Sequence, residues 1–329
     1  MTKENFIPLV SKIQNQRWRI TFPVFHRRGK DRFARQALGI LAIAASLLVP
    51  VIILALYKRT LPILEVQTLS ELLFSKEWYP LRGLFGFYPF IVGTFWVTAV
   101  GMVIAIPPAL LTAIYLAEYA HSKIYALATP IIDLLAGIPS VVYGIWGMLT
   151  VVPFIEKNIA PMLKLRLGVL PIFQSENPTG YSVLAGGVVL AVMVFPIIIA
   201  VAEEVISAVP QGLREASLAL GATRWHTVRH VVLRQAGPGV LAAVVLGFSR
   251  AFGETMAVLM VVGNVPQVPR SIFDAAYPLT ALIANNYGEM MSIPRYDAAL
   301  LGAALILLLV VLIFNLGARL ILVRMVKNR

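Results

Sequence analysis

The fold is decided by the stretch GPGVLAAVVLGFSRAFGETMAVLMVVG, residues 237–263, which carries only two ionisable residues, Arg250 and Glu254. Roughly 20 apolar residues of helix cross the hydrocarbon core of a bilayer, so the stretch predicts a membrane span. Arg250 lies midway along it. Because a guanidinium at the bilayer centre costs about 2.5–3.5 kcal/mol, an arginine at this depth predicts a functional site.

Five more runs of span length make the chain an all-α integral membrane protein with six predicted transmembrane helices. Of its 329 residues, 59% are hydrophobic and 13% are charged, and the mean hydropathy is +0.81. A soluble domain carries about twice that charged fraction, so the composition excludes one. Pro107 and Pro108 predict a bend within one of the spans. The other five predicted spans are residues 36–56, 88–116, 126–152, 183–201 and 298–323.

The net charge of +12 is a topology signal rather than a sign of nucleic-acid binding. Of the 28 Lys and Arg residues, 18 fall in the N-terminal segment, the C-terminal end and the alternate loops 117–125 and 202–236, whereas nine fall in the remaining loops. The positive-inside rule therefore predicts that both termini face the cytoplasm. Residues 1–35 hold nine of the basic residues without the apolar core of a signal peptide, and we expect a basic cytoplasmic extension ahead of a transmembrane domain, residues 36–329.

Arg250 and Glu254 allow two interpretations. In one continuous helix they lie four residues apart on the same face, where they could form a self-neutralising ion pair that only stabilises packing. Alternatively, the planar guanidinium of Arg250 faces a water-filled path and binds a tetrahedral oxyanion there. Phosphate keeps a proton at neutral pH and can donate it to Glu254, whereas sulfate cannot, so the carboxylate favours phosphate. Ser249 and Thr255 are small neighbours that we expect to line the same path.

The third run adds a carboxylate, Asp133, followed by Pro139 and several glycines. A charged residue and a helix breaker inside an apolar run indicate a helix that lines a path rather than one that faces lipid. Asp133 could also be a second counter-ion for Arg250 or an interfacial residue. Ser140 and Tyr143 are candidate path-lining donors, with ordinary helix packing as the alternative.

The loop 202–236 predicts two amphipathic helices joined at Gly221, because apolar residues recur at helical spacing on both sides of that glycine. Such an element can dock into a cleft of a partner protein or lie on the lipid surface. His226 and His230 share a helix face, but no third ligand accompanies them. We therefore predict no metal site.

In the same loop Glu215-Ala216-Ser217 is followed by Gly221 and, after nine residues, by Val231-Val232-Leu233. This pattern resembles the EAA loop of ABC-importer permeases, with Ser217 and Arg234 at positions where the family has alanine and proline. The sequences IPSVVYGIWG, residues 138–147, and RAFGETMAV, residues 250–258, resemble the third and fifth helices of the phosphate-specific, PstC-like branch of that family.

The resemblance implies a type I ABC-importer permease fold and inward transport of inorganic phosphate across the bacterial plasma (inner) membrane. It also implies the partners: a PstA-like second permease, two PstB-like ATP-binding subunits and a PstS-like phosphate-binding protein. The permease itself would then be no enzyme and would bind no cofactor, ATP and Mg being used by the ATP-binding subunits. By the same resemblance Arg250 and Glu254 lie on the translocation path. The coupling to the ATPase would rest on Glu215, Ala216, Ser217, Leu220, Gly221, Ala222, Thr223 and Trp225.

The residues support this division of labour independently, since the chain contains no G-x-x-x-x-G-K-[ST] loop to hold ATP phosphates. Two alternatives remain. One is a permease of the same architecture for another oxyanion, such as sulfate, molybdate or phosphonate. The other is an ATP-independent anion transporter or channel that uses Arg250 as its selectivity charge.

Overall fold

A computed structural model describes residues 25–175, 179–290, 293 and 295–327. The chain divides into two compact units, Met1–Ala55 and Leu56–Arg329. In the first unit the described chain is helical from Phe25, within α2 (Phe25–Leu64), and most side chains between residues 32 and 55 are exposed. Residues 1–24 of the predicted extension lie outside the described residues. No helix boundary separates the rest of the extension from the predicted span 36–56, since both belong to α2.

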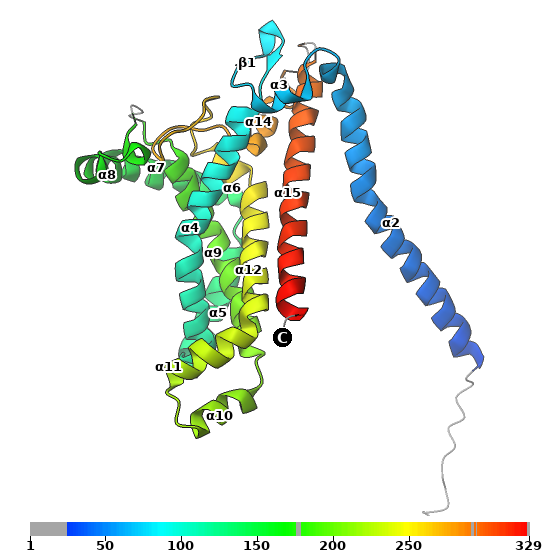
Figure 1. Cartoon of the computed structure of the whole chain (residues 1–329), viewed down its shortest axis with the longest axis vertical. Helices are drawn as coiled ribbons and strands as arrows, with labels where there is room; N and C mark the ends of the chain where they lie inside the picture. The colour runs from blue at the N-terminus through cyan, green and yellow to red at the C-terminus, as the bar shows by residue number, and fades with distance from the viewer. Residues whose placement is uncertain (1–24, 176–178, 291–292, 294, 328–329) are drawn as a thin grey trace, which may run out of the picture. The chain divides into compact units, whose positions relative to one another are not determined.

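Four long helices form the frame of the second unit: α4 (Tyr88–Glu118), α9 (Val183–Ser207), α12 (Leu233–Gly253) and α15 (Tyr296–Lys327). The helix α4 packs along α9, while α12 lies against both α9 and α15 (Figure 1). Pro107 and Pro108 lie inside α4, which continues through them as one helix.

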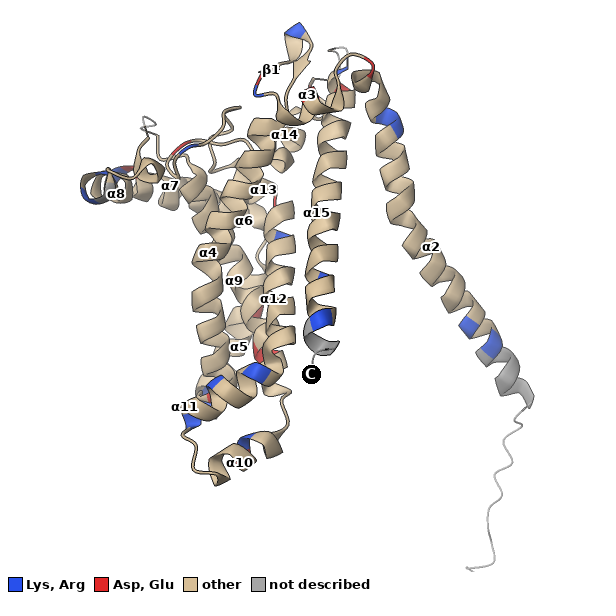
Figure 2. Ribbon diagram, viewed as in Figure 1, with Lys and Arg blue, Asp and Glu red and all other residues tan. Residues whose placement is uncertain are grey.

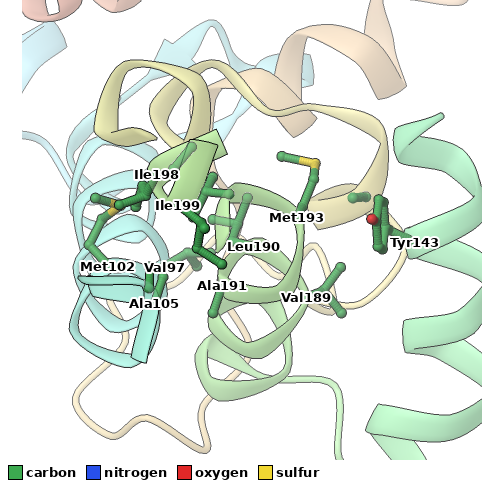
Figure 3. Close-up of a cluster of buried hydrophobic side chains, with 14 of the residues drawn as sticks. Val97, Met102, Ala105, Tyr143, Val189, Leu190, Ala191, Met193, Ile198 and Ile199 are labelled. Atoms are coloured by element: carbon green, nitrogen blue, oxygen red, sulfur yellow. The ribbon is translucent and has the colours of Figure 1, made fainter. Parts of the chain in front are cut away.

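The core is centred on α9, which is the most deeply buried of these helices. Its side chains Leu190, Met193 and Ile198 are almost completely enclosed, and Met102 of α4 packs into the same cluster (Figure 3). Small residues permit this close packing. A Cβ atom at Gly187 would lie 2.5 Å from Cγ1 of Val100 in α4. Membrane helices associate through such van der Waals contact between closely spaced backbones, so glycine is required here.

The predicted span 126–152 is not one helix, because α5 (Ser122–Gly137) ends before Pro139 and the chain turns by 92°. A residue that precedes proline avoids the α conformation, and Ile138 is accordingly extended, with ψ 130°. Beyond the turn the chain is helical from Ser140 to residue 167, with two π-helical stretches. Its segments are α6 (Ser140–Trp146), η3 (Gly147–Val151), α7 (Val152–Phe154), η4 (Ile155–Ile159) and α8 (Ala160–Leu167).

The predicted span 237–263 is also broken, at a place that hydrophobicity does not mark. The helix α12 ends at Gly253, Glu254 is extended with ψ 131°, and the short helix α13 (Met256–Leu259) follows. At its other end the helix starts earlier than predicted. The segments α11 (Arg224–Thr227) and η6 (Val228–Val232) run directly into α12 and form one helix with it.

The described residues contain five helices long and apolar enough to cross a membrane, or six when the bent pair of α5 and the helix that follows it is one span. Shorter elements lie at the two ends. One end holds α10 (Gln211–Ala219) and α11, and the other end holds α14 (Leu279–Asn286), α3 (Leu69–Phe74) and a small hairpin (Figure 1). Charged residues of this unit gather mainly at these ends and around α8 (Figure 2).

Aromatic rings anchor the hairpin to the helices. Its strands β1 (Trp78–Tyr79) and β2 (Leu84–Phe85) are antiparallel and are joined by η2 (Pro80–Arg82). Trp78 lies edge-on to Phe90 of α4 at 4.8 Å and to Tyr296 of α15 at 5.9 Å between ring centroids. Edge-to-face contacts of this kind stabilise by about 0.5–1.5 kcal/mol each beyond burial, so the hairpin is fixed at its base. Another 3₁₀ turn, η5 (Pro171–Phe173), precedes α9.

Candidate functional site

The two broken helices meet, because α6 packs against α13. Gly144 is the contact point: a Cβ atom there would lie 2.6 Å from Sδ of Met260 and 3.2 Å from Cα of Ala257. Non-helical backbone is tolerated at membrane depth only where protein buries it or where it lines a water-filled cavity. Two interruptions that face each other are therefore a candidate site for a polar solute.

Arg250 lies in the last turn of α12, immediately before its break, and is exposed in this chain. Within the described part of the chain it forms no ion pair and no hydrogen bond. The guanidinium thus faces away from the core, with its donors available.

Glu254 does not lie one helical turn beyond Arg250, as a continuous helix would require, because the chain leaves the α conformation at Glu254 itself. The side chain is half-buried, and its Oε1 accepts a hydrogen bond from the Ala257 N–H at 3.3 Å. Its backbone carbonyl accepts a hydrogen bond from the Thr280 hydroxyl at 2.9 Å. No ion pair joins Arg250 and Glu254, so the self-neutralising pair is absent from this conformation of the described chain.

The polar residues of the third run lie around the α5–α6 turn. The Tyr143 hydroxyl donates to the carbonyl of Leu135 at 2.7 Å and so bridges the turn. Ser140 is the first residue of α6 and is half-buried. Asp133 is exposed on α5 and contributes to a cavity of about 220 Å³ with Glu203 and Glu204 of α9. It forms no ion pair with Arg250 in the described structure.

Ser249 and Thr255 flank the charged pair and differ in their surroundings. The Ser249 hydroxyl donates to Oδ1 of Asn315 in α15 at 2.8 Å, so it joins two helices. Thr255 is half-buried in the α12–α13 break, where its hydroxyl donates to the Gly253 carbonyl at 3.3 Å. The structure therefore gathers Thr255, Glu254 and Arg250 at the break and turns Ser249 toward the neighbouring helix.

The loop after α9 forms the first predicted helix, α10, and Gly221 separates it from α11 as predicted. The second is not a separate short helix, because α11 continues through η6 into α12. Gly221 lies between them with φ +84°, a conformation that side chains with a Cβ rarely adopt. Thr223 caps α11 by accepting a hydrogen bond from the His226 N–H at 3.2 Å. Of the predicted coupling residues, Leu220 is 89% exposed and Trp225 is 54% exposed. Glu215 and Ala216 are exposed as well, and Ala222 is half-buried.

A buried ion pair fixes this loop to the helices and was missed by sequence reasoning. Arg214 of α10 donates from Nη2 to Oε1 of Glu118, the last residue of α4, at 2.7 Å, and Nε donates to the same oxygen at 3.1 Å. The side chains are only 14% and 7% exposed. The one available signal was a carboxylate, Glu118, at the end of a long apolar run.

His226 and His230 stack face to face, with ring centroids 4.2 Å apart, on an exposed face. Nδ1 of His230 lies 3.2 Å from the carbonyl oxygen of His226. Within the described residues, no group of three His, Cys, Asp or Glu side chains is placed to hold a metal ion.

Comparison with known proteins agrees with this architecture. Residues 109–327 match the family described as "Binding-protein-dependent transport system inner membrane component". The Bacillus subtilis "Probable ABC transporter permease protein YqgH" is 40% identical over 251 residues, 76% of this chain and 76% of that protein. The Xylella fastidiosa "Phosphate transport system permease protein PstC" is 36% identical over 269 residues, 80% of this chain and 82% of that protein.

A solved structure extends the likeness to the fold. The chain of a bacterial alginate ABC transporter, crystallised with a pentasaccharide-bound periplasmic protein, matches 89% of this chain and 93% of its own length. The TM-score is 0.58 at 17% identity, which carries the fold alone. The chain is thus a multi-pass membrane permease subunit and not itself a catalyst. It belongs to the family of inner membrane components of binding-protein-dependent transport systems.

Proposed function

We propose that the chain is the permease subunit of an ATP-driven importer of inorganic phosphate and forms half of the translocation path. The observation that carries the proposal is Arg250, exposed and unpaired within the described chain, where two broken helices meet. An arginine fork matches the geometry of a tetrahedral oxyanion. The substrate class is supported by the phosphate permeases among the relatives, such as the Xylella fastidiosa protein.

The exposure of Arg250 and Asp133 supports a second permease that covers these residues. Charged side chains inside a bilayer face a bundle interior or a water-filled cavity, not lipid. Both residues are exposed in the single chain, so a PstA-like subunit would complete the wall of the path. The path-lining set is Arg250, Glu254, Asp133, Ser140, Tyr143 and Thr255, with Ser249 holding α12 in place behind it.

The α10–α11 end would face the cytoplasm, with both termini on the same side, and would dock onto two PstB-like ATP-binding subunits. Exposed apolar side chains at this end, Leu220 and Trp225 foremost, are suited to a cleft of a partner protein. ATP and Mg would be held by those subunits, and the permease would bind no cofactor itself. A PstS-like binding protein would deliver phosphate at the opposite end.

The transport cycle follows from these assignments. Closure of the ATP-binding subunits would displace α10 and α11, and this movement would expose the Arg250 region alternately to each side. To shift the population from one state to the other almost completely, the ATP-bound form must favour its state by about 5 kcal/mol. Phosphate would bind Arg250 during this cycle and share its remaining proton with Glu254.

The decisive experiment is phosphate uptake by the reconstituted complex carrying Arg250→Gln. We expect uptake to fall at least 100-fold while hydrolysis stimulated by the binding protein persists, because Arg250 would hold the anion and not the ATPase. The matched control is Arg229→Gln, an exposed arginine of η6. Undiminished uptake with Arg250→Gln would reject the role of Arg250. Uptake of sulfate, molybdate or phosphonate in place of phosphate would favour a different oxyanion permease, and uptake without the ATPase would favour a secondary transporter.

A further inference from the structure

The Glu118–Arg214 ion pair joins three segments rather than two. Besides Glu118 of α4, the Arg214 guanidinium donates to the carbonyl of Ile206 in α9 at 2.9 Å, and to the carbonyl of Val209 just beyond that helix. It fills one wall of a cavity of about 450 Å³ that Glu118 and Thr227 also line. Arg214 thereby fastens α10 to the ends of both α4 and α9.

A second set of contacts attaches α11 to the same point. The Arg224 guanidinium donates to the backbone carbonyl of Glu118 and lies over the ring of Tyr119, 4.9 Å from its centroid. The hydroxyls of Ser217 in α10 and Thr227 in α11 are hydrogen-bonded at 2.9 Å. The helices α10 and α11 therefore form one block that is attached to the end of α4.

Hydrogen bonds connect the other half of α4 to the candidate site. The buried Thr94 hydroxyl accepts a hydrogen bond from the backbone N–H of Leu279, the first residue of α14, at 2.9 Å. The next residue, Thr280, donates its hydroxyl to the carbonyl of Glu254. From Thr94 to Glu118 the helix spans about 36 Å at 1.5 Å per residue. A continuous set of bonds thus runs from the loop to the break that contains Glu254.

A separate route leads from the loop to Arg250, since α11, η6 and α12 are one helix from Arg224 to Gly253. A movement of the loop would therefore reach Arg250 through α12. It would reach Glu254 both through α12, whose C-cap it is, and through α4 and α14. We propose that Glu118 and Arg214 are positioning residues that attach the loop to α4. Through this attachment, movement of the loop would displace Arg250 and Glu254 together. This proposal rests on the proposed function, because it assigns to the ion pair the coupling of ATP hydrolysis to uptake.

The test measures phosphate imported per ATP hydrolysed by the full complex in proteoliposomes. The variants are Glu118→Gln, Arg214→Gln and their combination, with Arg229→Gln as the exposed control in the same loop. We expect at least a tenfold fall in this ratio, with ATP hydrolysis kept within about threefold of the wild type. The double variant should be no worse than Arg214→Gln alone, because that single variant already removes the interaction with Glu118. The control should keep the wild-type ratio.

Thr94→Val tests the same route at its far end without touching the loop. It removes the hydroxyl that accepts the Leu279 N–H while keeping the side-chain size, so the ratio should fall here too. If the ion-pair variants import as much phosphate per ATP hydrolysed as the wild type, the inference is overturned. If those variants fail to assemble, a wild-type ratio in Thr94→Val overturns it instead. A strictly parallel loss of uptake and hydrolysis also overturns it, since a merely structural role lowers both together. Failure of the wild-type complex to import phosphate would instead refute the proposed function.

Discussion

The arginines Arg214 and Arg250 differ in their burial and in their hydrogen-bond partners. Arg214 is largely buried and donates to a carboxylate and two carbonyls at the α10–α11 end. Arg250 is exposed at the break after α12 and has no hydrogen-bond or ion-pair partner among the described residues. The Arg214 guanidinium is thus held by partners within the fold, whereas the Arg250 guanidinium keeps its donors available for a ligand. The comparison separates charge that maintains structure from charge that is available to a solute.

The largest expected effect is a difference in stability between the variants of the two arginines. Arg214→Ala leaves Glu118 buried without its counter-ion, and loss of one partner from a buried pair costs about 3–5 kcal/mol. Arg250→Ala removes no hydrogen bond or ion pair with a described residue and should change the free energy of unfolding by less than about 0.5 kcal/mol. Unfolding of the purified permease in detergent measures both. Equal losses in the two variants would abolish the distinction.

A smaller effect tests which anion the site around Arg250 selects. Glu254→Gln removes the carboxylate that repels an unprotonated dianion, so sulfate should gain on phosphate about tenfold, which corresponds to about 1.4 kcal/mol. Competition of sulfate with labelled phosphate for uptake by the complex is the measurement. Glu289→Gln, at an exposed carboxylate outside the break, is the matched control. An unchanged preference with Glu254→Gln would remove Glu254 from selection.

The smallest effect concerns the serine next to Arg250. A double-mutant cycle of Ser249→Ala and Asn315→Leu should give a coupling energy of about 0.6 kcal/mol, the average for hydrogen bonds between membrane helices. Thr112→Ala is the control, because that hydroxyl bonds only to the Pro108 carbonyl in its own helix. A cycle that gives no coupling would return Ser249 to the path-lining set.

Hydrophobicity was sufficient to find the helices that are long and apolar enough to cross a bilayer, because it depends on composition over many residues. It could not locate the break after Gly253, since apolar residues continue on both sides and one backbone change at Glu254 ends the helix. The turn before Pro139 was signalled by the proline, but its 92° angle depends on packing and on the Tyr143–Leu135 bond.

For a similar reason, only part of the candidate site could be predicted from the sequence. A lone ionisable residue in an apolar run, such as Arg250, stands out in any sequence. The Glu118–Arg214 pair does not, because its members are 96 positions apart and each resembles an ordinary loop charge. Only the folded chain brings the end of α4 over α10. The EAA-like pattern identified the loop, and the structure supplies what holds it.

The positions of two tryptophans give the molecule built-in optical reporters. Trp225 is more than half exposed on α11, where the proposed ATPase would dock, while Trp78 is half-buried among aromatic rings at the other end. Indole emission shifts to shorter wavelength when water is removed from the ring. Association with the ATPase subunits would thus change the emission of Trp225 and leave that of Trp78 constant, so a Trp225→Phe complex would lose the contribution of Trp225 to the spectral shift on assembly.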